Sequence, residues 1–438
     1  MISKSLLKSV IIDNRSEISQ TVVQRRDYVF DNFNYVLVGV RRAGKSYLLY
    51  QLILDYLKKG TSWDDLVYLN FEDDRLIGMD IADLDTILEV HAEISSTGQK
   101  PILFLDEIQN IESWEKFARR LADSKYRVYI TGSNAKMLSS EIMTTLGARY
   151  LCQEVFPFDF EEFLRAKKIK PFNINELTTR SKGKLNQLFN EYLEFGGFPE
   201  CLSLTVKRSY LSTLYQKIFL SDIAERNNIT NRLALRILFK KLAESVKQPI
   251  SYNRLTKLIK ATGLEIGTST IINYINYAKD ACLIYDVENF TGKLVDKETN
   301  PKHYFIDNGI LKLLHLDPLS SQLENLVAIT LLKRYGTHDA VFFYNDKFEV
   351  DFYVPEKQLA IQITTSLGTP DSDTYQREVD ALVKFNRRFK NSNNIILTLR
   401  EEPQANYDDK IMIKDEETES VVQIKVLPIW KWLLEKEI

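Results

Sequence analysis

The sequence contains few of the residues that build metal centres and disulfide frameworks. Three cysteines and four histidines occur among 438 residues, and neither set is clustered along the chain. Scattered cysteines in this number are typical of small buried side chains in a reducing compartment. We therefore expect no zinc site, no histidine–metal site and no disulfide scaffold.

Long apolar runs are also missing. No segment approaches the roughly 18 consecutive apolar residues that a membrane-spanning helix needs. The apolar segment near the amino terminus is too short and too interrupted for a signal peptide. We therefore expect a cytoplasmic protein that makes no membrane contact.

An excess of charge of one sign is lacking as well. The chain has 58 basic and 60 acidic residues, so its net charge is only −2. A near-neutral chain is not expected to coat nucleic acid by charge alone, although a local basic face remains compatible with this balance. Length and apolar content are ample, because 438 residues with 44% hydrophobic side chains predict about three domains with buried cores.

A glycine-framed loop lies between an apolar run and a helical pattern. The run 'YVLVGV' is typical of a buried parallel strand, and 'YLLYQLILDYLKK' has the apolar spacing of a helix. This context predicts a P-loop, in which backbone N–H groups surround phosphate at the start of a helix. An ordinary strand–helix turn is the alternative. The predicted nucleotide-binding residues are Gly39, Val40, Arg41, Arg42, Ala43, Gly44, Lys45, Ser46 and Tyr47.

Specific roles follow for two side chains of this loop and for two acids further along. Lys45 is expected to reach the β- and γ-phosphates of ATP, and the Ser46 hydroxyl to bind Mg²⁺. The apolar run 'PILFLDEIQNI' stops at Asp106 and Glu107, and we expect its strand to lie next to the loop strand. Asp106 is then the predicted second ligand of Mg²⁺, and Glu107 is predicted to orient the water that attacks the γ-phosphate.

Two other strand patterns also end in polar residues. 'RVYITGSNAKML' ends with Ser133 and Asn134, and Asn134 is expected to hydrogen-bond the γ-phosphate or the attacking water. A simple strand-to-helix cap is the alternative there. 'LVYLNFEDDRL' ends with Glu72 and two aspartates, for which we expect a structural or lid role.

Several segments, taken in order, resemble a known family. 'GVRRAGKS', 'YLNFEDDRL', 'FLDEIQNIESWEKFARRL', 'ITGSNAKMLSSEI', 'LGARY' and 'FPFDFEEFL' are together similar to a prokaryotic AAA-type ATPase family with a carboxy-terminal domain of unknown function. The resemblance implies ATP and Mg²⁺ as cofactors, held by the loop, Asp106 and Glu107 as above. It also implies that Arg149 touches the γ-phosphate, within its own chain or from a neighbouring subunit. A surface arginine is the alternative.

Three helical patterns and two strand patterns from residue 231 onward predict a winged helix. The third of these helices is rich in aromatic and amide side chains but lacks arginine; it offers Asn273, Tyr274, Asn276, Tyr277 and Lys279. DNA affinity depends on basic groups that contact phosphate. The candidates for such contacts are Arg254, Lys257, Lys260 and Lys293. A protein-docking surface is the alternative.

The last part of the chain resembles the restriction-endonuclease-like fold. A helix with Glu324 precedes strands that contain Asp351 and Gln362, and another helix follows. In the active form of that fold an acid and a lysine lie where this chain has Gln362 and Thr364. Lys347 and Lys357 are the nearest lysines in sequence, and we expect both to face solvent. We therefore expect a degenerate nuclease fold that is used for binding rather than cleavage.

Together these features predict an α/β protein with a P-loop ATPase core and parallel sheet at 15–165, a helical lid at 166–230, a winged helix at 231–310 and a degenerate restriction-endonuclease-like domain at 318–438. The predicted function is ATP hydrolysis coupled to conformational change and to binding of DNA or a partner protein. The alternatives are an ATP-gated switch without turnover and an ATP-regulated DNA nuclease. An oligomer is compatible with the sequence.

Overall fold

The computed structural model describes residues 2–134, 140–169, 177–292, 299–316, 318–391, 393–401, 410–415 and 417–435. The chain forms two compact units, residues 1–156 with 280–282 and residues 157–279 with 283–438. The first unit contains residues 15–156 of the predicted ATPase core, and residues 157–165 of that range lie in the second unit. The second unit also contains the predicted lid and carboxy-terminal ranges and the predicted winged-helix range, except for residues 280–282.

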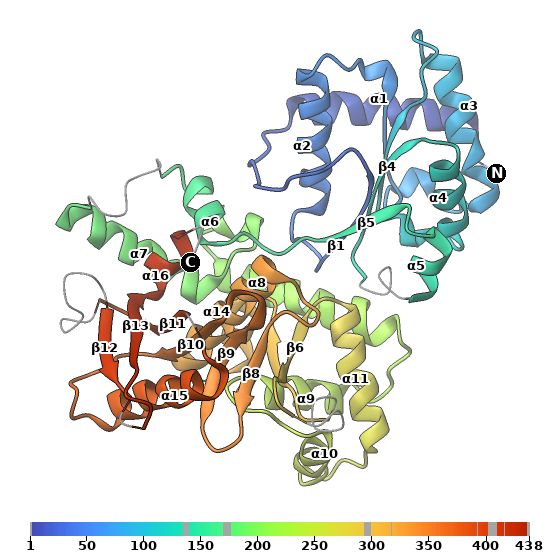
Figure 1. Cartoon of the computed structure of the whole chain (residues 1–438). Helices are drawn as coiled ribbons and strands as arrows, with labels where there is room; N and C mark the ends of the chain where they lie inside the picture. The colour runs from blue at the N-terminus through green and yellow to red at the C-terminus, as the bar shows by residue number, and fades with distance from the viewer. Residues whose placement is uncertain are drawn as a thin grey trace. The chain divides into compact units, whose positions relative to one another are not determined.

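A five-stranded sheet forms the centre of the first unit (Figure 1). Neighbouring strands pair in parallel, in the order β2-β3-β4-β1-β5. The strands at its centre are apolar and buried on both faces, as expected of a parallel sheet that helices cover on both sides. The strands are β1 (Asn34–Val38), β2 (Leu66–Asn70), β3 (Ile102–Asp106), β4 (Arg127–Gly132) and β5 (Tyr150–Glu154).

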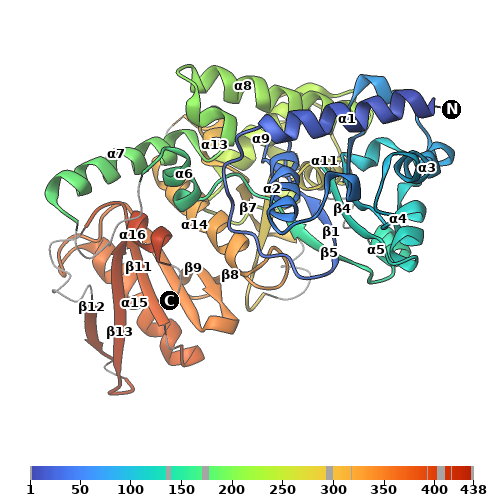
Figure 2. The same cartoon turned by 90° about the horizontal axis from the view of Figure 1, so that it is seen from above.

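Helices cover both faces of this sheet. The connection from β1 to β2 crosses the sheet in the direction opposite to the other connections, so right-handed crossovers place α2 on one face and α3 and α4 on the other (Figure 1). The first helix, α1, packs along β2 and α3 (Figure 2). The helices are α1 (Lys4–Gln20), α2 (Lys45–Lys58), α3 (Asp85–Ile94), α4 (Trp114–Asp123) and α5 (Ser140–Leu146).

The strand order corrects one expectation. The strand that ends at Asp106 was predicted to lie next to the loop strand, but β4 lies between β3 and β1. Parallel strands end at the same edge of a sheet, and two strand spacings amount to only about 10 Å. Asp106 and the loop after β1 therefore still lie at one edge, within reach of side chains.

An eight-stranded mixed sheet organises the described part of the second unit, in the order β12-β13-β11-β10-β9-β8-β6-β7. Its carboxy-terminal strands β11 to β13 lie side by side (Figure 2). β6 and β7, the two strands predicted to form a wing, pair with each other, and β6 also pairs in parallel with β8. These two strands are therefore continuous with the carboxy-terminal sheet. The strands are β6 (Ile284–Asn289), β7 (Lys302–Phe305), β8 (Phe342–Asn345), β9 (Glu349–Val354), β10 (Leu359–Thr364), β11 (Asn393–Thr398), β12 (Lys410–Lys414) and β13 (Val421–Pro428).

Helices α14 and α15 both pack against β9 and β10 of this sheet. The predicted winged-helix helices are present as α9, α10 and α11, and the Ser251 side chain caps α10 as its sequence indicated. Within the described ranges, no helix has both the length and the apolar character to cross a membrane. The helices are α6 (Phe160–Ala166), α7 (Thr179–Phe195), α8 (Lys207–Lys217), α9 (Arg232–Glu244), α10 (Tyr252–Lys260), α11 (Thr268–Asp280), α13 (Asn308–Leu314), α14 (Leu319–Tyr335), α15 (Asp373–Phe389) and α16 (Ile429–Leu434).

Candidate nucleotide site and a second cavity

The loop between β1 and α2 has the backbone shape of an anion cradle. It passes through left-handed conformations at Arg42, with φ 66°, and at Gly44, with φ 98°. No side chain caps the start of α2. The first N–H groups of that helix therefore have no partner within the helix, and such groups bind phosphate.

A close approach explains the first glycine of the loop. A Cβ atom at position 39 would lie 2.2 Å from the carbonyl oxygen of Val155. Any side chain at Gly39 therefore displaces either the loop or the segment that follows β5. The nucleotide loop and this segment are packed against each other through their main chains.

Lys45 is buried within the loop. Its Nζ donates to the carbonyl oxygens of Gly39 at 3.0 Å and Val40 at 3.3 Å, and it lies 3.4 Å from Glu107 Oε1. One carboxylate at this distance leaves the ammonium able to bind further negative charge. The predicted loop lysine and the predicted catalytic acid are thus brought together.

Asp106 is buried at the end of β3. It accepts hydrogen bonds from Tyr68 Oη at 2.7 Å and from the Thr131 hydroxyl. Burial and the neighbouring Glu107 carboxylate raise the pKa of Asp106, although the hydroxyls of Ser46, Thr131 and Tyr68 oppose that rise. A cation bound at this edge favours the ionised form.

The residues present fit Mg²⁺ bound together with a nucleotide. Ser46 and Asp106 would supply two oxygen ligands, and Mg²⁺ in such sites takes its other ligands from phosphate and water. Among the described residues, no group of three histidine, cysteine or acidic side chains is arranged to hold a metal ion on its own. The site therefore suits a nucleotide-dependent ion better than a permanent metal centre.

Glu107 is oriented by its neighbours. Its Oε2 accepts from Gln109 Nε2 at 2.5 Å and from the Ser133 backbone N–H at 3.2 Å. Burial raises the pKa of Glu107, but the Lys45 charge, the hydrogen bonds from Gln109 and Ser133 and the Arg41 charge together outweigh burial and leave the pKa lowered. The buried oxygens Gln109 Oε1 and Ser133 Oγ have no hydrogen-bond partner in the described structure. They offer hydrogen-bonding capacity to a ligand or water beside Glu107.

The strand register separates the other two predicted catalytic residues. Asn134 follows β4, whose Gly132 pairs with Val38 at the end of β1, so Asn134 lies at the same edge as the loop. Arg149 precedes β5, whose first residue pairs with Asn34 at the start of β1. It lies at the opposite edge, roughly 17 Å of strand away. The register thus argues against the expected contact between Arg149 and a γ-phosphate in its own chain.

Arg149 forms an ion pair and a hydrogen bond at that opposite edge of the sheet. Its Nε pairs with Asp123 at the end of α4, and its Nη1 donates to the Gly147 carbonyl oxygen at 3.1 Å. Contact with the phosphate of a neighbouring subunit stays a prediction. At the loop itself, Arg41 forms an ion pair of 3.1 Å with Glu72, which gives that acid a place beside the nucleotide site.

Comparison with known proteins agrees with this geometry. An AAA domain model matches residues 31–164, and a model of a domain of unknown function, DUF8612, matches residues 186–322. The uncharacterized protein MJ1544 of Methanocaldococcus jannaschii is 35% identical over 448 residues, which cover 99% of this chain and 96% of that protein. The chain belongs to this family of AAA-domain proteins.

Other relatives of the family are more distant. An uncharacterized protein of Haemophilus influenzae is 28% identical, with 96% of this chain and 98% of that protein covered. Among solved structures, the Walker-type ATPase PABY2304 of Pyrococcus abyssi aligns at 14% identity with a TM-score of 0.41, covering 68% of this chain and 99% of that chain.

One residue beside the nucleotide loop in the first unit was not predicted from the sequence. Arg26 is buried and donates to the carbonyl oxygen of Ala43 in the loop. It lies between α1 and β1 in a segment without regular secondary structure. No motif surrounds it, so the sequence carried no signal for its role.

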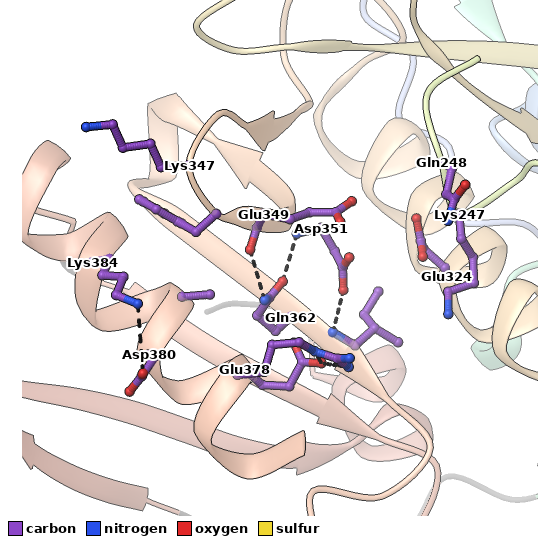
Figure 3. Close-up of a pocket in the computed structure, with 14 residues that line it drawn as sticks. Lys247, Gln248, Glu324, Lys347, Glu349, Asp351, Gln362, Glu378, Asp380 and Lys384 are labelled. Carbon is purple, nitrogen blue, oxygen red and sulfur yellow. Dashed lines mark hydrogen bonds and ion pairs between the residues drawn. The ribbon is translucent and has the colours of Figure 1, made fainter. Parts of the chain in front are cut away.

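A second cluster of acids lines a cavity of about 530 Å³ in the second unit (Figure 3). Two of its acids, Glu324 and Asp351, were predicted as remnants of a nuclease site, and Glu349 and Glu378 were not. Exposed basic side chains also line the cavity; they are Lys247, Lys347, Arg377 and Lys384.

A lysine beneath this cavity neutralises its acids. Lys302 is fully buried, and its Nζ lies 3.1 Å from Glu324 Oε1 and 2.9 Å from Glu349 Oε1. Burial lowers the pKa of Lys302, but the carboxylates of Glu324, Asp351 and Glu349 outweigh burial and leave the pKa raised. The positive charge beside these carboxylates is therefore supplied by Lys302 of the chain itself.

Gln362 and Thr364 stand at the positions where the active nuclease fold has an acid and a lysine. Both side chains form hydrogen bonds within the chain. Gln362 accepts from the Asp351 backbone N–H at 2.8 Å and donates to the Glu349 carbonyl oxygen at 3.2 Å, as Figure 3 shows. The Thr364 hydroxyl donates to the Ser366 carbonyl oxygen at 2.9 Å. Lys347 and Lys357 are exposed, as their sequence positions indicated. These contacts give Gln362 and Thr364 structural roles.

The predicted DNA-binding residues divide into two groups. Arg254, Lys257 and Lys260 are exposed on α10, whereas Lys293 lies outside the described residues. On α11 the two asparagines at 273 and 276 are exposed and Tyr277 is partly exposed. Tyr274 is buried in the core, and Lys279 is paired with Asp286 at 2.7 Å. The exposed basic groups are thus on the second helix rather than the third.

Proposed function

We propose that this protein hydrolyses ATP in the presence of Mg²⁺ at the loop between β1 and α2. The observation that supports this most directly is the meeting of Lys45 and Glu107 at 3.4 Å, beside the uncapped start of α2. The first is the cation that a phosphate requires, and the second is an ionised base that is held in place. An ATP-gated switch needs the first of these but not the second.

The roles of the residues follow from their contacts. The loop N–H groups and Lys45 bind the phosphates, and Ser46 and Asp106 bind Mg²⁺, which neutralises charge on the transferred phosphoryl group. Glu107 orients the attacking water and accepts its proton. Gln109 and the Ser133 N–H keep the Glu107 carboxylate in one orientation, which supports in-line attack.

The test is the change Glu107→Gln. The amide retains the size of the side chain but accepts no proton, so we expect ATP to bind and its hydrolysis to slow by about a hundredfold or more. Phosphate release under single-turnover conditions measures the rate, and calorimetry measures binding. Glu115→Gln, a change of a partly exposed residue at the start of α4, is the control. Hydrolysis at the wild-type rate in Glu107→Gln contradicts the proposal.

We further propose that nucleotide state governs binding of duplex DNA through the second unit. The exposed cations Arg254, Lys257 and Lys260 on α10 support this, because phosphate contacts supply most of the affinity of such surfaces. Replacing the three by glutamine is expected to abolish binding in fluorescence anisotropy and to flatten its salt dependence. Binding that does not change in the triple variant, or that is insensitive to salt, favours a protein partner instead.

A further inference from the structure

A buried arginine joins the nucleotide loop to the segment through which the chain leaves the first unit. Arg26 is 3% exposed; its Nη1 donates to the Ala43 carbonyl oxygen at 2.9 Å and its Nη2 to the Phe156 carbonyl oxygen at 2.7 Å. Ala43 belongs to the loop. Phe156 is the last residue before the second unit begins at Pro157. One guanidinium therefore holds both segments.

The neighbours of Arg26 fix its position. Its backbone N–H donates to Gln51 Oε1 at 2.8 Å, and Gln51 Nε2 donates to the Arg26 carbonyl oxygen at 3.0 Å. Gln51 lies on α2, the helix that begins at the loop. The Tyr28 ring lies 5.1 Å from the guanidinium carbon. Both the main chain and the side chain of Arg26 are thus anchored around the loop.

A second contact joins the same two segments independently. Val155 N–H donates to the Val38 carbonyl oxygen at 2.7 Å, and the Val155 carbonyl oxygen packs against Gly39. The exit segment therefore contacts the loop directly at its first residue and through Arg26 at Ala43. A movement of the loop on binding phosphate is transmitted to Val155 and Phe156.

The contact at Ala43 also orients the loop. In a planar trans peptide, the Ala43 carbonyl oxygen and the Gly44 N–H point in opposite directions. By holding that oxygen, Arg26 directs the Gly44 N–H to the other side, as a phosphate cradle requires. We propose that Arg26 is a positioning residue that shapes the nucleotide loop and links its occupancy to the exit segment 155–156. This inference rests on the proposed ATP binding.

Hydrogen exchange of the full chain, with and without a non-hydrolysable ATP analogue and Mg²⁺, tests the link. In the wild type we expect the analogue to slow exchange both in the loop and in peptides that contain residues 153–158. In Arg26→Met we expect binding about tenfold weaker, because a charged hydrogen bond that shapes the loop is lost. At saturating analogue, slowing should then persist in the loop and be smaller at 153–158, where only the direct contact of Val155 remains.

Two further variants separate bridging from charge. Arg26→Lys keeps the charge, but its single ammonium lacks the fork that spans two carbonyl oxygens, so we expect the slowing at 153–158 to be smaller in this variant as well. Arg25→Met is the matched control, because Arg25 is exposed and pairs with Asp55 at 3.0 Å. It should behave as the wild type.

The outcomes are distinct. If the analogue slows hydrogen exchange of the wild type only in the loop, the proposed link between the loop and residues 155–156 is wrong, whatever the variants show. Slowing at 153–158 that is as large in Arg26→Met at saturation as in the wild type also overturns it. A wild-type chain that binds no analogue overturns the proposed ATP binding itself, whereas a chain that binds it without any response at 153–158 overturns only the link.

Discussion

Two buried lysines of this protein lie beside carboxylates, and their surroundings differ. Lys45 in the first unit has one carboxylate at 3.4 Å and two backbone carbonyl oxygens. Lys302 in the second unit lies between Glu324 and Glu349 at 3.1 and 2.9 Å. The charge of Lys45 is only partly neutralised, so phosphate can still bind it. The charge of Lys302 is matched by the chain itself.

The acids beside these lysines differ in the direction of their pKa shifts. At Glu107, Lys45 acts together with Gln109, Ser133 and Arg41 to outweigh burial and lower the pKa. At Asp351, burial and Glu324 outweigh the attraction of Lys302 and raise the pKa well above its usual range. At the nucleotide loop the positive charge of Lys45 is therefore only partly neutralised. In the carboxylate cavity Lys302 supplies the counter-charge of the acids. We conclude that one site is arranged for ligand chemistry and the other for internal neutralisation.

Removing the lysine from each site should have unequal effects on stability. Lys302→Met leaves Glu324 buried without its counter-charge, and loss of one partner of a buried pair costs about 3–5 kcal/mol. Lys45→Met should cost less, because Gln109 and the Ser133 N–H still bind Glu107. Hydrogen exchange in the core strands of each unit measures the two losses. Equal losses would remove the distinction between the lysines.

The acids should respond to pH in opposite directions. A folded-state pKa above the ordinary value, as at Asp351, gives stability that is present below pH 3.8 and is lost as pH rises through the folded value. A lowered pKa, as at Glu107, gives stability that is present above pH 4.5 and is lost as pH falls through the folded value. At pH 7, Asp351→Asn should therefore stabilise the second unit, and Glu107→Gln should destabilise the nucleotide-free first unit.

Urea denaturation between pH 4 and 8, monitored by hydrogen exchange of each unit, checks both signs. Asp380→Asn, an exposed change at the same cavity, is a control for Asp351→Asn. Destabilisation of the second unit by Asp351→Asn at pH 7 would show that Lys302 stabilises the Asp351 charge after all.

Local sequence was sufficient to predict the candidate site residues that are consecutive along the chain. The loop from Gly39 to Ser46 and the pair Asp106–Glu107 lie at one edge of the sheet because each follows a strand of a parallel sheet, and a strand with its polar end can be read from sequence. The order of strands could not be read in this way. It depends on which strands pair, and β4 consequently came between β3 and β1.

Residues that act through long-range contacts could not be predicted. Lys302 and Glu324 are 22 positions apart, and Arg26 and Phe156 are 130 apart, with no motif around either cation. Arg149 illustrates the reverse case. The family resemblance of 'LGARY' implied a phosphate contact, but the register of β5 with β1 places Arg149 at the far edge of the sheet. Only the three-dimensional pairing reveals these relations.

Calorimetric titration of the full chain with ATP and Mg²⁺ tests the central distinction most directly. We predict one ATP per chain, binding that Lys45→Ala abolishes, and unchanged affinity in Asp351→Asn, because the buried lysine of the loop is only partly neutralised whereas Lys302 is paired with two carboxylates. Binding that survives in Lys45→Ala, or that is lost in Asp351→Asn, would contradict the assignment of nucleotide binding to the loop between β1 and α2.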